Sequence, residues 1–129
     1  MNSILRRRRA LMGAKGESFP VQEIGVELIE TILTGYVVDA DTGALTGNSG
    51  GRYCTYIPVN PNYRYQFRKY TNRQGFGAWY DKEKNYISGF SASNNSTYDN
   101  KTPPTMARYM RWSGYYASSG GPLSIKRIS

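Results

Sequence analysis

The chain has 129 residues, of which 39% are hydrophobic, and a formal net charge of +8, which fits a single globular domain. It contains no histidine and one cysteine, so imidazole-dependent catalysis, an internal disulfide and a cysteine-cluster zinc site are excluded. The sequence therefore predicts no enzyme, no metal and no cofactor, and a binding or structural role remains.

The excess positive charge is concentrated in the first fifteen residues. Five of the 17 cations lie there without any acid, so residues 16–129 carry 12 − 9 = +3. We therefore expect a basic N-terminal anchoring arm over residues 1–20 and a separate, nearly neutral domain over residues 21–129. Because the basicity belongs to the arm, nucleic-acid binding by the domain is not favoured.

The arm has the pattern of a short amphipathic helix that is interrupted by arginines. The residues that would make assembly contacts are Ile4, Leu5, Leu11 and Met12 on one side, with Arg6, Arg7, Arg8 and Arg9 between them. Three interpretations stay open: a disordered basic tail, a segment that docks on a partner subunit, and an arm for nucleic acid or a membrane surface. The arginines break the apolar run that a secretion signal needs, and no stretch approaches the ~20 apolar residues of a membrane-spanning helix.

From Val26 onward the sequence is typical of an all-β protein, because short β-branched and aromatic runs alternate with Gly, Asn, Asp and Pro. The clearest strand is Tyr63–Tyr70, in which aromatic and polar side chains alternate. The other expected strands are Glu27–Leu33, Gly35–Val38, Tyr53–Val59, Gly77–Asp81, Tyr86–Ser91, Thr105–Ser113 and Leu123–Ile128. This number of strands in one domain predicts a jelly-roll β-sandwich.

The run DADTGA after Val38 predicts a hairpin turn with Gly43 at positive φ. Its two aspartates resemble the opening of a calcium loop, but Gly50 stands where an EF-hand requires Glu, so the turn is the preferred interpretation. Cys54 lies in an apolar-aromatic run with no histidine to act as its base. We expect it to be a small core residue.

The run Arg73–Tyr80 (RQGFGAWY) resembles the RNA-stacking motif of RRM domains, in which glycines and aromatic residues alternate. Gln74 is inserted after the basic residue, and Ala78 stands where a stacking ring belongs. We therefore interpret the run as a glycine-rich loop that enters a strand and places Trp79 or Tyr80 in the core.

The 12 tyrosines are more than one small core can hold with a hydrogen-bond partner for each hydroxyl. Some are therefore expected at a surface or interface, where tyrosine and tryptophan rings bind proteins and flat sugar faces. The candidate glycan contacts are Trp79, Tyr80, Asp81, Arg111 and Trp112, with the rings stacking on sugars and the charged groups bonding hydroxyls.

Two parts of the chain resemble bacteriophage proteins. The opening MNSILRRRRALMGAK is similar to the start of small tail and virion proteins of phages and prophages. The body resembles the carbohydrate-binding-like jelly rolls of phage tail fibres, baseplates and receptor-binding proteins. The segments that carry this second resemblance are Tyr56–Val59, Asn60–Tyr65, Trp79–Asp81, Tyr86–Phe90, Thr102–Pro104 and Ala107–Trp112.

The resemblance implies a non-enzymatic virion protein, made in the bacterial cytoplasm, whose jelly roll attaches to a host surface glycan and whose arm anchors it to the particle. Its partners would be other virion proteins and further copies of itself, as a trimer or higher oligomer. One alternative is a capsid decoration protein, or another purely structural virion protein, without a ligand. A third hypothesis is nucleic-acid binding through the arginine run.

Overall fold

The computed structural model describes residues 19–70, 73–93 and 97–129, and these form an all-β fold. The strands are β1 (Leu33–Val38), β2 (Leu45–Tyr53), β3 (Ile57–Pro58), β4 (Tyr65–Arg68), β5 (Gly75–Tyr80), β6 (Tyr86–Ala92), β7 (Tyr98–Lys101), β8 (Tyr109–Tyr115) and β9 (Ser124–Arg127). The predicted assembly contacts of the arm, residues 4–9, 11 and 12, lie outside the described residues.

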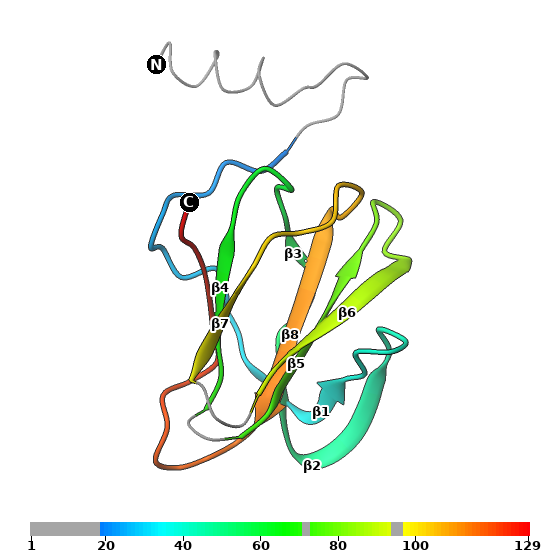
Figure 1. The fold of residues 1–129 in the computed structure, drawn as a ribbon. Helices are drawn as coiled ribbons and strands as arrows, with labels where there is room; N and C mark the ends of the chain where they lie inside the picture. Colours follow the sequence, from blue (N-terminus) through cyan, green and yellow to red (C-terminus); the bar gives the residue numbers. More distant parts are fainter. Residues whose placement is uncertain (1–18, 71–72, 94–96) are drawn as a thin grey trace.

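The strands form two antiparallel sheets that face each other (Figure 1). The larger sheet has the order β1-β2-β8-β5-β6, with β3 also paired to β8, and the smaller sheet has the order β7-β4-β9. Neighbouring strands are often distant in sequence, since β8 inserts between β2 and β5. The predicted all-β sandwich is confirmed.

Aromatic side chains fill the space between the sheets. Phe67 of the smaller sheet contacts both tryptophans of the larger sheet, with ring centroids 5.7 Å from Trp79 and 5.4 Å from Trp112. Phe90 stacks on Trp112 at 5.8 Å with an interplanar angle of 8°. Cys54 is buried in the same core, as predicted. These rings supply much of the apolar area that the sandwich removes from water.

The glycines of the RQGFGAWY run make room for these rings. A Cβ atom at Gly75 would lie 2.4 Å from the indole of Trp112, and one at Gly77 would lie 2.4 Å from the ring of Phe90. Both glycines belong to strand β5, which lies between β8 and β6, so the glycine-rich part of the run is itself in a strand and is not a loop leading into one. The prediction that Trp79 or Tyr80 is buried is confirmed, since both are.

The β1–β2 hairpin folds back over the outer face of the larger sheet. Its turn has the predicted geometry, with Gly43 at φ 77°. The tip lies so close to β6 that a Cβ atom at Gly89 would come within 1.7 Å of the carbonyl oxygen of Ala40. The hydroxyl of Tyr86 donates to that same oxygen at 2.7 Å. A second, smaller core therefore forms under the hairpin, around Val38, Ala78 and Tyr80.

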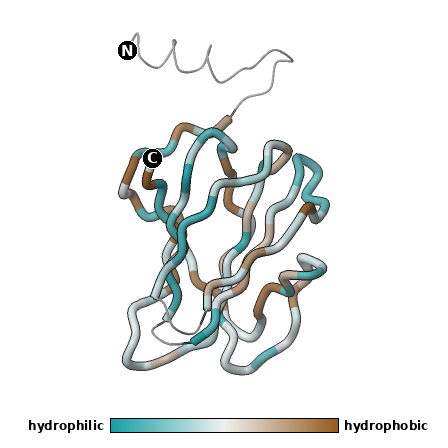
Figure 2. Tube along the Cα trace, viewed as in Figure 1, coloured by the Kyte–Doolittle hydropathy of each residue, from teal (hydrophilic) through white to brown (hydrophobic). Residues whose placement is uncertain are grey.

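The segment before β1 lies along β9 but is not a regular strand. It makes only isolated bridges, Ile24 with Arg127 and Glu27 with Lys126. The carboxylate of Glu27 accepts hydrogen bonds from the backbone N–H groups of Ile29 and Ile125, at 3.1 and 2.9 Å. A side chain therefore takes the place of backbone hydrogen bonds that a regular strand would make with β9. The expected strand Glu27–Leu33 is therefore wrong. Hydrophobic stretches of this segment lie beside the C-terminus (Figure 2), and Val21, Ile24 and Val26 are exposed.

Two strands were not expected from the sequence. β2 has the sequence LTGNSGGRY, and β7 has the sequence YDNK, so both lack the β-branched and aromatic runs that predict strands.

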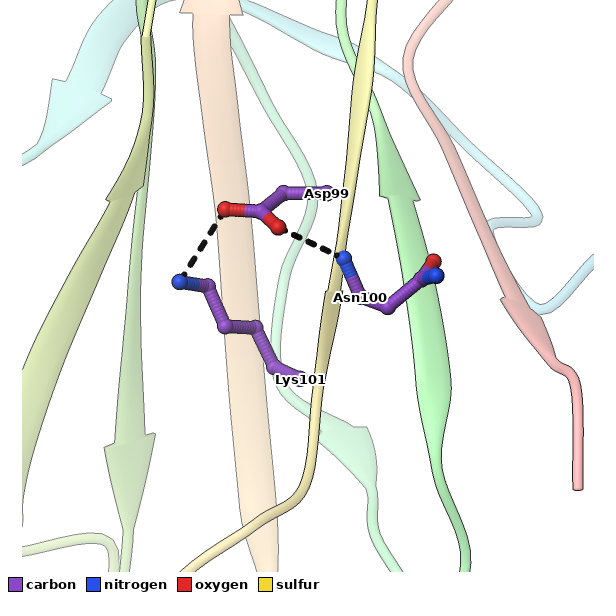
Figure 3. A network of polar contacts seen from close by, with 3 residues as sticks. All are labelled: Asp99, Asn100 and Lys101. Atoms are coloured by element: carbon purple, nitrogen blue, oxygen red, sulfur yellow. Dashed lines mark hydrogen bonds and ion pairs between the residues drawn. The ribbon is translucent and has the colours of Figure 1, made fainter.

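On the edge strand β7, Asp99 and Lys101 point to one side and form an ion pair at 3.1 Å, while Asn100 points to the other (Figure 3). Asp99 lies opposite Phe67, so the pair occupies core-facing positions. Inward charges of this kind protect a sheet edge from further pairing.

Candidate functional site

Strand alternation separates the residues that the sequence grouped as glycan contacts. Trp79 and Trp112 point into the core with 4% and 0% of their surfaces exposed. Neither ring has a face open to a sugar, so the expectation that these two rings stack on a glycan is corrected: both are core residues. Tyr80 and Arg111 point to the opposite face of the same two strands, because successive side chains alternate along a strand.

Tyr80 and Arg111 together fasten the tip of the β1–β2 hairpin. Nε of Arg111 donates to the hydroxyl oxygen of Tyr80 at 2.9 Å, and Nη2 donates to the carbonyl oxygen of Gly43 at 2.5 Å. The Tyr80 hydroxyl donates to the same carbonyl at 2.6 Å. Arg111 is only 8% exposed, and burial raises the pKa of Tyr80. This arrangement keeps the guanidinium in one place on the outer face.

The predicted contact Asp81 organises a turn between β5 and β6. Its carboxylate accepts the backbone N–H groups of Asn85 and Glu83, each at 2.9 Å. Those hydrogen bonds, the one from Asn85 first, lower the pKa of Asp81. The turn places Lys84 at φ 68°, which makes it the single non-glycine residue of the described chain with positive φ. Asp81 thus positions Lys84 through the turn.

Lys84 and Arg111 lie over tyrosine rings on the outer face. Nζ of Lys84 is 5.1 Å from the ring centroids of both Tyr56 and Tyr109, and the Arg111 guanidinium carbon is 4.4 Å from the centroid of Tyr56. The rings of Tyr56 and Tyr109 lie 6.1 Å apart, and both side chains are half-buried. We name these four residues the cationic tyrosine surface. Distances of this size allow cation–π attraction.

The charges of this surface have no acidic partner among residues 19–70, 73–93 and 97–129. The one ion pair found there is Lys101 with Asp99 on β7. Six cations lie over aromatic rings: Arg52, Arg73, Lys84, Arg108, Arg111 and Arg127. The cationic tyrosine surface differs from the other cation–ring contacts because two cations, Lys84 and Arg111, lie over one ring, that of Tyr56.

A hollow of about 260 Å³ also borders Tyr56, between residues 28–31 and residues 54–58. Thr31 and Thr55 contribute hydroxyl groups to its lining, and Glu30 a carboxylate. Cys54 lies at its inner wall, where burial raises the pKa of the thiol to about 11. A thiol that stays protonated is a poor nucleophile, so this hollow can offer hydrogen bonds and apolar contact but no thiolate chemistry.

The sequence identified Tyr80, Asp81 and Arg111 but not the three other residues that the fold places beside them. Tyr56 and Tyr109 belonged to the excess of tyrosines, without a signal that set them apart. Lys84 lies in the run DKEKN, which reads as a solvated turn. The sequence does not indicate the left-handed backbone conformation of Lys84, because residues with that conformation are usually Gly, Asn or Asp.

No family model, no curated protein and no solved structure matches this chain. The described part of the chain contains no helix long and apolar enough to cross a membrane. It also contains no group of three or more acidic, cysteine or histidine side chains that could hold a metal ion.

Proposed function

We propose that the protein is a non-enzymatic binding component of a bacteriophage or prophage particle, which attaches to a host surface glycan. The cationic tyrosine surface would contact the glycan, and the arm over residues 1–20 would join the domain to other virion proteins. The observation that carries the binding proposal is the pair of half-buried rings, Tyr56 and Tyr109, with two cations over them and no acidic partner in the described chain.

Several features of this surface suit a carbohydrate. Tyrosine rings offer flat apolar faces together with a polar group, and the weak single contacts of such sites gain avidity from display in many copies. Thr31 and Thr55 line the hollow that Tyr56 borders, and their hydroxyls can exchange hydrogen bonds with a sugar. Tyr56 is the residue that the hollow and the cationic tyrosine surface have in common.

The test is a glycan array probed with the full chain displayed in many copies. Tyr56→Ala and Tyr109→Ala should each abolish the signal that the unchanged chain gives. Tyr98→Ala is the matched control, because Tyr98 is exposed on β7 of the other sheet. A blank array, or a signal that all three variants retain, would count against glycan attachment through this surface.

A purely structural role, as capsid decoration or another virion subunit without a ligand, is the second candidate. The exposed apolar side chains of Val21, Ile24 and Val26 favour it, since they directly follow the arm and could lie against a neighbouring subunit. Deleting residues 1–15 should then leave the domain folded but prevent its incorporation into particles. Incorporation at the normal level would oppose anchoring by the arm. Location on the head or on the tail of the particle would separate the two candidates.

A further inference from the structure

Arg111 retains donor capacity on the outer face. Its Nε and Nη2 atoms are engaged by Tyr80 and Gly43, at 2.9 and 2.5 Å. No described residue accepts a hydrogen bond from Nη1, and no carboxylate of the described chain pairs with the guanidinium. A mostly buried cation of this kind is unfavourable unless an anion compensates it.

Lys84 brings a second cation to the same place at a cost in backbone energy. A left-handed conformation costs a non-glycine residue roughly 1–2 kcal/mol. Here the hydrogen bonds of Asp81 with Glu83 and Asn85 impose it, and the ammonium comes to lie over Tyr56 and Tyr109. An outlier of this kind is retained more readily where the side chain has a task that glycine could not perform.

Together these observations identify the ligand class. We infer that Lys84 and Arg111 bind an anionic oxygen group, so that the ligand of the cationic tyrosine surface is an acidic saccharide and not a neutral one. Both cations lie within 5.1 Å of the ring centroid of Tyr56, so one ligand at this ring can reach both of them. The fixed guanidinium supplies geometry, and the ammonium supplies a point charge. This inference rests on the proposed glycan attachment.

The anion site can be tested apart from the sugar, with inorganic phosphate as the probe. In NMR spectra of the full chain, phosphate at constant ionic strength should cause saturable shifts of the Arg111 Nε–H signal and of the Lys84 amide. Lys84→Gln should weaken this binding about 10-fold or more, as expected for the loss of a hydrogen bond between charged groups. Arg111→Lys should also weaken it, and its folding is checked by the signals of the core.

Arg73→Gln is the matched control for charge alone. Arg73 is exposed and lies over a single ring, that of Tyr115, at 5.2 Å. It should change phosphate binding at Lys84 and Arg111 by less than about 2-fold, because the effect of one distant surface charge is screened by salt. Shifts that never saturate, or that are spread evenly over all basic residues, would overturn the inference.

The saccharide class is tested with polygalacturonate and its methyl ester, two polymers that differ in charge but not in sugar. Binding of the acidic polymer alone, lost in Lys84→Gln, supports the inference and the proposed function together. Equal binding of both polymers through Tyr56 and Tyr109 leaves glycan attachment standing and overturns the inference. Saturable phosphate binding with no affinity for either polymer supports the anion site and counts against these glycans as its ligand.

Discussion

The hydroxyl oxygen of Tyr80 lies 2.9 Å from Nε of Arg111 and accepts its hydrogen bond. This bond joins the neighbouring strands β5 and β8 on the outer face of the larger sheet, and both side chains also donate to the carbonyl oxygen of Gly43. One pair of residues therefore holds the hairpin tip and fixes the cation over Tyr56. We therefore expect the stability of the fold and the proposed binding to depend on the same two residues.

Tyr80→Phe should lower the stability of the fold and weaken phosphate binding. The change leaves Nε of Arg111 and the carbonyl of Gly43 without the hydroxyl, and a buried group that loses its partner costs about 1–3 kcal/mol. Denaturant unfolding of the full chain should show this loss, and phosphate binding should weaken because the guanidinium is less fixed. Tyr98→Phe, at an exposed position, should shift the unfolding free energy by less than about 0.5 kcal/mol. Unchanged stability of Tyr80→Phe would refute the coupling.

Lys84→Gly should separate the stability of the fold from anion binding. Glycine adopts positive φ without steric cost, so stability should stay the same or rise by up to about 1 kcal/mol. Phosphate binding should nevertheless weaken about 10-fold or more, and binding of the acidic polymer should be lost, because the ammonium over Tyr56 and Tyr109 is gone. Thermal unfolding and an NMR titration of the same sample measure both effects. A stable variant that binds as well as the unchanged chain would exclude Lys84 from the site.

Gly89→Ala should displace the hairpin tip. A Cβ atom at this position would lie 1.7 Å from the carbonyl oxygen of Ala40, a backbone atom that moves only with the hairpin. Overpacking of this kind costs typically ~1–3 kcal/mol, and thermal unfolding should show it. Gly121→Ala is the control, since nothing lies within 4 Å of a Cβ atom there. Equal unfolding temperatures for the two variants would mean that the tip is not held against β6.

The protein should lose stability in alkaline solution. Burial raises the pKa of Cys54 from 9.0 to about 11 and the pKa of Tyr65 from 10.0 to about 12. The folded state then holds these protons more tightly than the unfolded chain, so unfolding releases protons and its free energy falls as pH rises through this range. Below pH 9 both contributions are fully present.

Denaturant unfolding between pH 8 and pH 12 measures this effect, and Cys54→Ala should have a smaller slope between pH 9 and 11. A thiol reagent at pH 8 should react with Cys54 only after unfolding, because the thiol is buried and protonated in the native state. Rapid modification of the folded chain would show that the thiol is accessible.

Much of the fold could be predicted from the sequence, because the alternation of side chains along a strand and the residue preferences of turns are local signals. The alternating strand around Tyr65 and Phe67 and the turn at Gly43 were predicted and are present. β2 was missed because its pairing with β1 and β8 is tertiary, and LTGNSGGRY has little strand propensity of its own. Another long-range feature that the sequence could not predict is the position of the β1–β2 hairpin over the outer face of the larger sheet.

Only some residues of the candidate site could be predicted from the sequence, because alternation along a strand shows which residues share a face but not which face is buried. Trp79 and Tyr80 are adjacent in a strand, so they must point to opposite faces and cannot share one binding surface. Alternation does not say which of the two faces is the core. The space that Gly75 and Gly77 leave for the rings of Trp112 and Phe90 decides this in favour of the tryptophans.

The cationic tyrosine surface draws Tyr56, Lys84, Tyr109 and Arg111 from separate places in the chain and depends on the hairpin tip at Gly43. No continuous peptide contains it. Proteolytic fragments, denatured protein on a blot and short synthetic segments should all fail to bind, and an antibody that blocks attachment should recognise a conformational epitope.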